Sequence, residues 1–134
     1  NILEVRVVDS VPPQYVLAIP SLVGTLLYDE SAFSSAQSIL MDLPQDEFKF
    51  YKKAVSKDAL QAEVNRTNFA KIGRQLVEIA LHELGSKEEN WLLPFFELYT
   101  KEGRTPADES LDLFRKCGEN PDKWLAKVLN NSDY

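Results

Sequence analysis

Two side chains near the start of the chain, Glu4 and Arg6, have the types and spacing for chemistry on phosphates. They lie in the segment Ile2-Leu3-Glu4-Val5-Arg6-Val7-Val8, whose β-branched content predicts a strand over residues 2–8. Successive side chains of a strand point to opposite faces, so Glu4 and Arg6 share one face and the other face is apolar. A carboxylate can bind Mg²⁺, and a guanidinium can hold a phosphate or a carboxylate through paired hydrogen bonds. The pair therefore suits phosphoryl-transfer chemistry.

The spacing of Glu4 and Arg6 fits either a catalytic or a structural role. Enzymes that activate a carboxylic acid with ATP need metal ions to neutralise phosphate charge and fixed cations to stabilise the transferring group. Charged residues that alternate along an exposed strand face are common, however, and a cross-strand salt bridge explains them as well. From spacing alone, the salt bridge is the simpler interpretation.

The strand over residues 2–8 needs partner strands. At least two further strands are normally required for a stable sheet, and the helical sequence that follows offers none. We therefore expect this chain to be the C-terminal part of a larger protein, with the N-terminal remainder of that protein as its partner.

The first half of the remaining sequence predicts helices. Pro12-Pro13 predicts a turn. Apolar residues cover nearly every side of residues 14–29, which is typical of a core helix enclosed by others, with Pro20 kinking or breaking it. A repeat of three and four residues predicts an amphipathic helix over 31–43, and another helix follows Gln45.

Caps and glycines set the expected boundaries in the second half. Thr67 or Asn68 caps a helix that Gly85 ends, and the next helix has Pro94 in its opening turn and Gly103 at its close. The last two helices begin at Thr105-Pro106-Ala107-Asp108 and at Asn120-Pro121, with Gly118 between them. Residues 57–65 form a short helix or a loop. The sequence thus predicts a mainly α domain over 1–134, with about six helices and one N-terminal strand.

Composition excludes several classes of protein. The chain has 134 residues, a net charge of −6 and 44% hydrophobic residues. This acidity disfavours nucleic acids and anionic membranes as partners, because both need clustered Lys and Arg. The longest apolar stretch, residues 15–28, is too short to span a bilayer about 30 Å thick. A single cysteine, Cys117, excludes an internal disulfide and fits a cytoplasmic location.

Common site signatures are missing from the sequence, including a P-loop, a glycine-rich dinucleotide turn and a nucleophile elbow. The only histidine, His82, falls near the C-terminal end of a predicted helix, and we interpret it as a surface or packing residue. Cys117 is interpreted as a small buried hydrophobe.

Three segments carry a family resemblance. They are the strand motif Glu4-x-Arg6-x-x-Asp9, residues 15–29 with Ala18-Ile19-Pro20 and a Leu-Leu-Tyr-Asp end, and Gly103-Arg104-Thr105-Pro106-Ala107. In this order they resemble the C-terminal part of glutamate-cysteine ligases of the plant and proteobacterial type. The strand motif alone is weakly specific, and the combination, which covers most of the chain, is considerably stronger.

The resemblance implies an ATP-dependent carboxylate-amine ligase of the glutamine-synthetase-like superfamily, with a larger α+β fold built on a curved antiparallel sheet. In such an enzyme γ-glutamyl phosphate forms before the cysteine amine attacks, which is the first step of glutathione synthesis. By resemblance Glu4 is a metal ligand, Arg6 is a catalytic and substrate-binding residue, and Asp9 is structural. The cofactors implied are Mg²⁺ and ATP, and the substrates are glutamate and cysteine.

Other interpretations stay open at this point. Family members continue with glycines after the motif, whereas Ser10-Val11-Pro12-Pro13 follows here, which leaves the amine acceptor open. A helical interaction module that adds its strand to a partner's sheet edge also explains the opening segment. A relative that kept the fold and lost the reaction is a third possibility. Arg104 and the other charged residues of the helices are assigned no site role.

Overall fold

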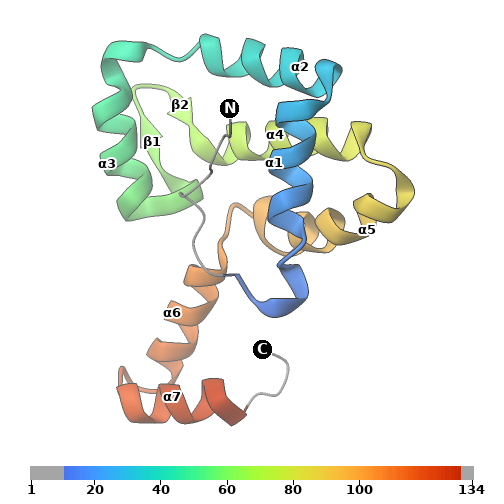
Figure 1. Ribbon diagram of the computed structural model, residues 1–134. Coiled ribbons are helices and arrows are strands. Elements are labelled where there is room, and N and C mark those ends of the chain that lie inside the picture. Colours follow the sequence, from blue (N-terminus) through green and yellow to red (C-terminus); the bar gives the residue numbers. More distant parts are fainter. Residues whose placement is uncertain (1–10, 131–134) are drawn as a thin grey trace, which may run out of the picture.

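The computed structural model describes residues 11–130 and shows a mainly α-helical fold, which confirms the predicted fold class. The strand predicted over residues 2–8 lies outside the described residues. Within them there are seven α-helices, one short antiparallel hairpin and several single turns (Figure 1). In chain order the elements are η1 (Pro13–Tyr15), α1 (Ala18–Tyr28), α2 (Glu30–Met41), η2 (Gln45–Glu47), α3 (Phe48–Asp58), η3 (Ala59–Gln61), β1 (Glu63–Val64), β2 (Thr67–Asn68), α4 (Phe69–Glu83), α5 (Ser86–Phe95), the π-helix η4 (Phe96–Thr100), α6 (Pro106–Lys116) and α7 (Pro121–Asn130).

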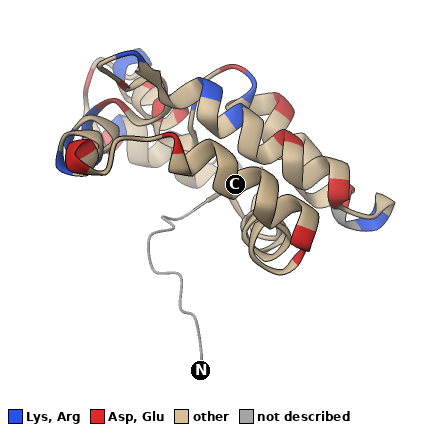
Figure 2. Ribbon diagram, turned by 90° about the horizontal axis from the view of Figure 1, so that it is seen from above, with Lys and Arg blue, Asp and Glu red and all other residues tan. Residues whose placement is uncertain are grey.

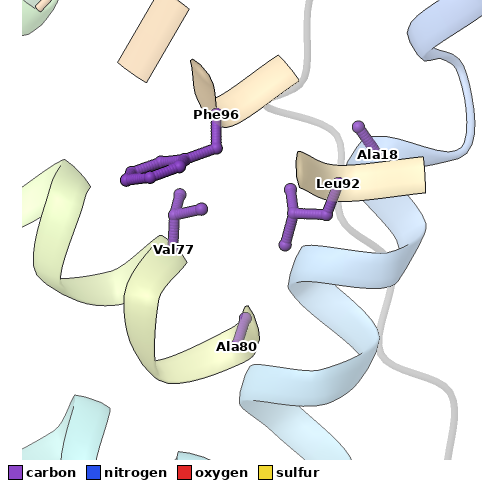
Figure 3. Close-up of a cluster of buried hydrophobic side chains, with 5 residues drawn as sticks. All are labelled: Ala18, Val77, Ala80, Leu92 and Phe96. Atoms are coloured by element: carbon purple, nitrogen blue, oxygen red, sulfur yellow. The ribbon is translucent and has the colours of Figure 1, made fainter. Parts of the chain in front are cut away.

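The main core lies where α1, α4, α5 and the π-helix meet. Its buried side chains come from all four elements and converge on one cluster (Figure 3), made of Ala18, Val77, Ala80, Leu92 and Phe96. Alanines on α1 and α4 let these helices approach closely, and the larger side chains of α5 and the π-helix fill the remaining space. Burial of such apolar surface is the main source of stability.

Helix α1 is less enclosed than its sequence predicts. It packs against α2, α4 and α5, yet Ala18 is its only buried residue. Leu27 is 37% exposed and Tyr28 is 82% exposed. The prediction of a helix enclosed by others is therefore wrong for the C-terminal end of α1, because apolar side chains that should be covered are exposed there.

Helix α4 begins where the sequence predicts. The side chain of Asn68 accepts a hydrogen bond of 2.8 Å from the backbone N–H of Lys71, as an N-cap should. Gly85 does not end α4 as the left-handed C-terminal residue that the sequence predicts. Gly85 has φ −68° and is the residue before α5, which begins at Ser86. The two helices follow each other too closely for a left-handed terminal glycine.

Pro94 lies inside a helix, near the end of α5, and not in an opening turn as predicted. Proline has no N–H and its ring crowds the preceding turn, which disturbs the regular hydrogen-bond pattern. A π-helix follows at once, and the Lys101 N–H bonds to the Phe96 carbonyl at 2.9 Å. Such π segments commonly occur as irregular turns within α-helices.

Residues 57–65, predicted to form a short helix or a loop, contain the end of α3, a 3-10 turn and the first strand of the hairpin. Strands β1 and β2 pair through Glu63 with Asn68 and Val64 with Thr67. The two turn residues, Asn65 and Arg66, have φ 53° and 96°. A two-residue hairpin turn of this kind requires positive φ at both positions. The sequence lacks the usual glycine there, so the hairpin was not predicted.

Helices α6 and α7 form a separate arm that extends away from the other helices (Figure 1). Both predicted starts are confirmed. Thr105 and Asp108 form a reciprocal capping box at α6, and Asn120 accepts a bond of 3.0 Å from the Lys123 N–H at α7. Gly118 has φ 69°, the left-handed conformation predicted for a helix end.

No single helix within residues 11–130 is long and apolar enough to cross a membrane. The segments Pro13–Tyr28 and Glu30–Met41 pass that test only as a pair, and they meet at a bend of 90°.

Candidate functional site

The sequence-predicted site residues, Glu4 and Arg6, lie outside the described residues, as does Asp9. Their assignment as metal ligand, catalytic residue and structural acid stays a prediction. Within residues 11–130 no group of three or more His, Cys, Asp or Glu side chains is placed to hold a metal ion. The described helices therefore supply no metal centre of their own.

The structure places His82 at the surface and Cys117 among buried residues, as the sequence predicts. The His82 ring is exposed at the end of α4, and its Nδ1 lies 3.1 Å from Oε1 of Glu83. The same carboxylate oxygen accepts a bond of 2.8 Å from the Ser31 hydroxyl, which ties α4 to α2. Cys117 is buried at the end of α6.

The segment Gly103-Arg104-Thr105-Pro106-Ala107 joins the π-helix to α6. Gly103 is buried with φ 66°, and a Cβ atom there would lie 3.6 Å from the Cβ of Ala70 on α4. The Arg104 N–H bonds to the Tyr99 carbonyl at 2.9 Å. Thr105 caps α6, and Pro106 is its first residue, where a missing N–H costs nothing. The residue types at Gly103, Thr105 and Pro106 are thus explained by the junction itself.

Charged side chains around this junction are paired. The Arg104 guanidinium forms an ion pair with Asp112 of α6, in which Nη2 of Arg104 lies 2.5 Å from Oδ2 of Asp112. The other Asp112 oxygen lies 3.4 Å from Nη1 of Arg115. Beside them, the Tyr99 hydroxyl donates a hydrogen bond of 2.7 Å to Glu109. All of these side chains except Tyr99 are partly exposed, so water screens the ion pairs and each contributes little to stability.

A pocket of about 310 Å³ lies among these side chains, which we call the Arg104 pocket; it is lined by Leu98, Tyr99, Arg104, Glu109, Asp112, Leu113 and Lys116. Its lining holds two cations, Arg104 and Lys116, and two carboxylates, Glu109 and Asp112. Because Arg104, Glu109 and Asp112 already bond one another or Tyr99, the arrangement favours joining α6 to the π-helix over gripping a charged ligand.

A second concave surface is apolar. This groove, called the apolar groove below, has a volume of about 480 Å³ and lies between α1, α2, α4 and the start of α3, with walls that include Leu26, Phe33, Leu40, Met41, Phe48 and Leu76. No charged side chain lines it. Helix α2 carries no Lys, Arg, Asp or Glu between Glu30 and Asp42 and is tan over that length in Figure 2.

Comparison with known proteins supports the resemblance. The chain is 28% identical over 131 residues to the chloroplastic glutamate-cysteine ligase of Solanum lycopersicum. The match covers 95% of this chain and 25% of the relative, so the chain spans about a quarter of the length of the curated relative that it matches. No protein family profile matches the chain, and no solved structure does. The chain is thus distantly similar to one part of a glutamate-cysteine ligase.

Neither the pairing of Arg104 nor the apolar groove is evident from the sequence. The partner of Arg104 is eight residues away across a helix cap, a spacing that no periodic pattern reveals. The groove is formed by four elements, and its existence depends on how they pack. A partial signal was present for the groove, because residues 14–29 are apolar on nearly every side.

Proposed function

We propose that this chain is the C-terminal part of an ATP-dependent carboxylate-amine ligase that joins the γ-carboxylate of glutamate to the amine of cysteine. The observation that carries the proposal is the match to glutamate-cysteine ligase along 95% of the chain. The order of the strand motif, the α1 sequence and the Gly103–Ala107 junction supports it. A role in glutathione synthesis follows from the same likeness.

The proposed reaction has two steps. An oxygen of the glutamate γ-carboxylate attacks the γ-phosphorus of ATP, the bond to ADP breaks, and γ-glutamyl phosphate results. The amine nitrogen of cysteine then attacks the carbonyl carbon, phosphate leaves with the original carboxylate oxygen, and the amine loses a proton. Arg6 is assigned to bind the transferring phosphoryl group, whose negative charge a fixed guanidinium stabilises.

Mg²⁺ and ATP are part of this proposal. Glu4 is assigned as one ligand of Mg²⁺. The bound ion would neutralise the negative charge of the phosphates. One carboxylate cannot hold the metal alone, and residues 11–130 offer no cluster of ligands. The other ligands would therefore belong to the part of the longer polypeptide that this chain does not span. The helices described above would support the strand and flank the site.

The test uses the polypeptide encoded at full length. We expect ADP release that requires Mg²⁺, glutamate and an amino acid acceptor together. Glu4→Gln and Arg6→Lys should each lower the rate by about a hundredfold or more, because each removes an interaction with the transferring group. Glu102→Gln, an exposed carboxylate on the loop before α6, is the matched control and should leave the rate unchanged. Full activity in both Glu4→Gln and Arg6→Lys would remove the site assignment.

A helical interaction module is the second candidate, and the apolar groove is the observation that favours it. Such a protein would bind its partner without consuming ATP. Absence of nucleotide-dependent amide formation in the full-length polypeptide, together with a tight complex with another protein, would favour the module. The cytoplasmic location expected from the single cysteine stays a prediction under both candidates.

A further inference from the structure

We propose that the apolar groove is the docking surface for the part of the longer polypeptide that lies outside this chain, and that it receives apolar side chains from that part. This inference rests on the proposed function, because the matched ligase is about four times as long as the chain, which covers 25% of it. Within residues 11–130, several apolar side chains that line the groove remain exposed.

Several apolar side chains on the walls of the groove are exposed to solvent. Met41 is 67% exposed, Phe48 62%, and Phe33 and Leu40 each 45%. These residues are neighbours along one side of α2 and the start of α3, so they form a continuous patch and not scattered single residues. Soluble monomers rarely leave large continuous apolar patches in water, and such patches usually mark an interface.

The sequence of α1 gives independent support. Residues 14–29 are apolar on nearly every side, which is the pattern of a helix covered all round. In the structure α2, α4 and α5 cover part of α1, whereas Leu27 faces the groove and remains partly exposed. One covering element is missing, and the groove is where it would lie.

The chemistry of the groove selects the kind of occupant. Its lining has no charged side chain, and its only polar members are Gln37 and Gln45. A nucleotide or an acidic substrate would find no cation there. An anionic membrane is disfavoured by the net charge of −6. Apolar protein side chains fit the lining best.

A segment of the same polypeptide would also outcompete a second copy of this chain for the apolar groove. A segment on the same polypeptide is present at an effective concentration of about millimolar. A second copy at micromolar concentration would need about a thousandfold higher intrinsic affinity to occupy the same groove. The remainder of the same polypeptide is therefore the favoured occupant.

The test compares thiol labelling at two positions of α2, read peptide by peptide by mass spectrometry. Met41→Cys places a thiol in the groove, and Ser38→Cys places one on the same helix away from the groove lining. Both positions are exposed in this chain, so neither variant disturbs the core. Each variant is made in the full-length polypeptide and in residues 1–134.

We expect Met41→Cys to react at least about tenfold more slowly in the full-length polypeptide than in residues 1–134, since reaction would require local opening. Ser38→Cys should react at similar rates in both. Equal rates for Met41→Cys, or equal protection at both positions, would overturn the proposal. Protection within residues 1–134 that grows with concentration would indicate a second copy and would also overturn it, as would a natural polypeptide no longer than this chain.

The ligase assay on the unsubstituted full-length polypeptide separates the two proposals. Protection of Met41→Cys without ligase activity would remove the proposed function alone. Ligase activity with an unprotected Met41→Cys would remove the docking surface alone.

Discussion

The hydroxyl of Tyr99 donates a hydrogen bond of 2.7 Å to the carboxylate of Glu109. Tyr99 belongs to the π-helix and is 4% exposed, whereas Glu109 lies in the first turn of α6. This bond links the main helical core to the α6–α7 arm, which otherwise extends away from it. The Arg104–Asp112 ion pair is a second contact between this junction and α6.

Tyr99→Phe should lower the free energy of unfolding by about 1–2 kcal/mol, because a hydrogen bond to a carboxylate is lost while the ring contacts remain. The ring lies 5.1 Å from that of Phe95, centroid to centroid, and phenylalanine keeps this contact. Urea unfolding of the single variants and of Tyr99→Phe with Glu109→Ala gives the coupling energy. Changes that add to within about 0.3 kcal/mol would show that the two side chains do not interact.

Gly24 and Gly73 are predicted to respond differently to substitution by alanine. Both lie inside helices, where alanine is favoured over glycine by about 0.5–1 kcal/mol. A Cβ at Gly24 would meet no atom within 4 Å, so Gly24→Ala should stabilise the chain by that amount. A Cβ at Gly73 would lie 3.0 Å from Cδ2 of Leu60, so Gly73→Ala should cancel the gain or destabilise. Thermal unfolding of both variants provides the measurement, and equal shifts would contradict the packing described around Gly73.

Stability should fall at high pH through Tyr51. A hydrogen bond with Thr67 lowers the pKa of the Tyr51 phenol, but burial, the hydrogen bond to Glu47 and the nearby negative charge together raise it above its usual value of 10.0. The folded protein thus holds this proton more tightly than the unfolded chain does. The stabilising contribution is present below about pH 10 and is lost as pH rises through the folded pKa.

Urea unfolding of the native chain and of Tyr51→Phe between about pH 8 and pH 11 checks this expectation. Lysines titrate in the same range, including Lys101, whose pKa is raised by its hydrogen bond to Glu97 and the charge of that residue. The difference between the two proteins cancels that common contribution. Parallel pH profiles would show that Tyr51 has no part in the loss.

Local signals in the sequence predicted the parts of the fold that local forces decide. The caps at Asn68, Thr105 and Asn120 were found because a short polar side chain bonds an N–H only three residues away. Gly85 and Pro94 were misplaced, since their roles depend on where the neighbouring helix begins. The hairpin turn was missed because Asn65 and Arg66 adopt positive φ without a glycine.

The sequence-predicted site and the apolar groove differ in how they relate to the sequence. Glu4 and Arg6 were selected from a strand motif, and they lie outside the described residues. The apolar groove depends on the packing of four elements, so no single periodic pattern contains it. The apolar residues along α1 predicted a helix enclosed by others, whereas Leu27 and Tyr28 are exposed in the described part of the chain.

The central claim is that the full-length polypeptide forms an amide through γ-glutamyl phosphate, and transfer of an oxygen isotope tests it most directly. Glutamate labelled with ¹⁸O in the γ-carboxylate is incubated with ATP, Mg²⁺ and cysteine, and the released phosphate is analysed by mass spectrometry. The account predicts one ¹⁸O atom in each phosphate released with amide formation, because the leaving phosphate carries a carboxylate oxygen. Phosphate free of ¹⁸O would mean that ATP is hydrolysed by water, and would contradict the account.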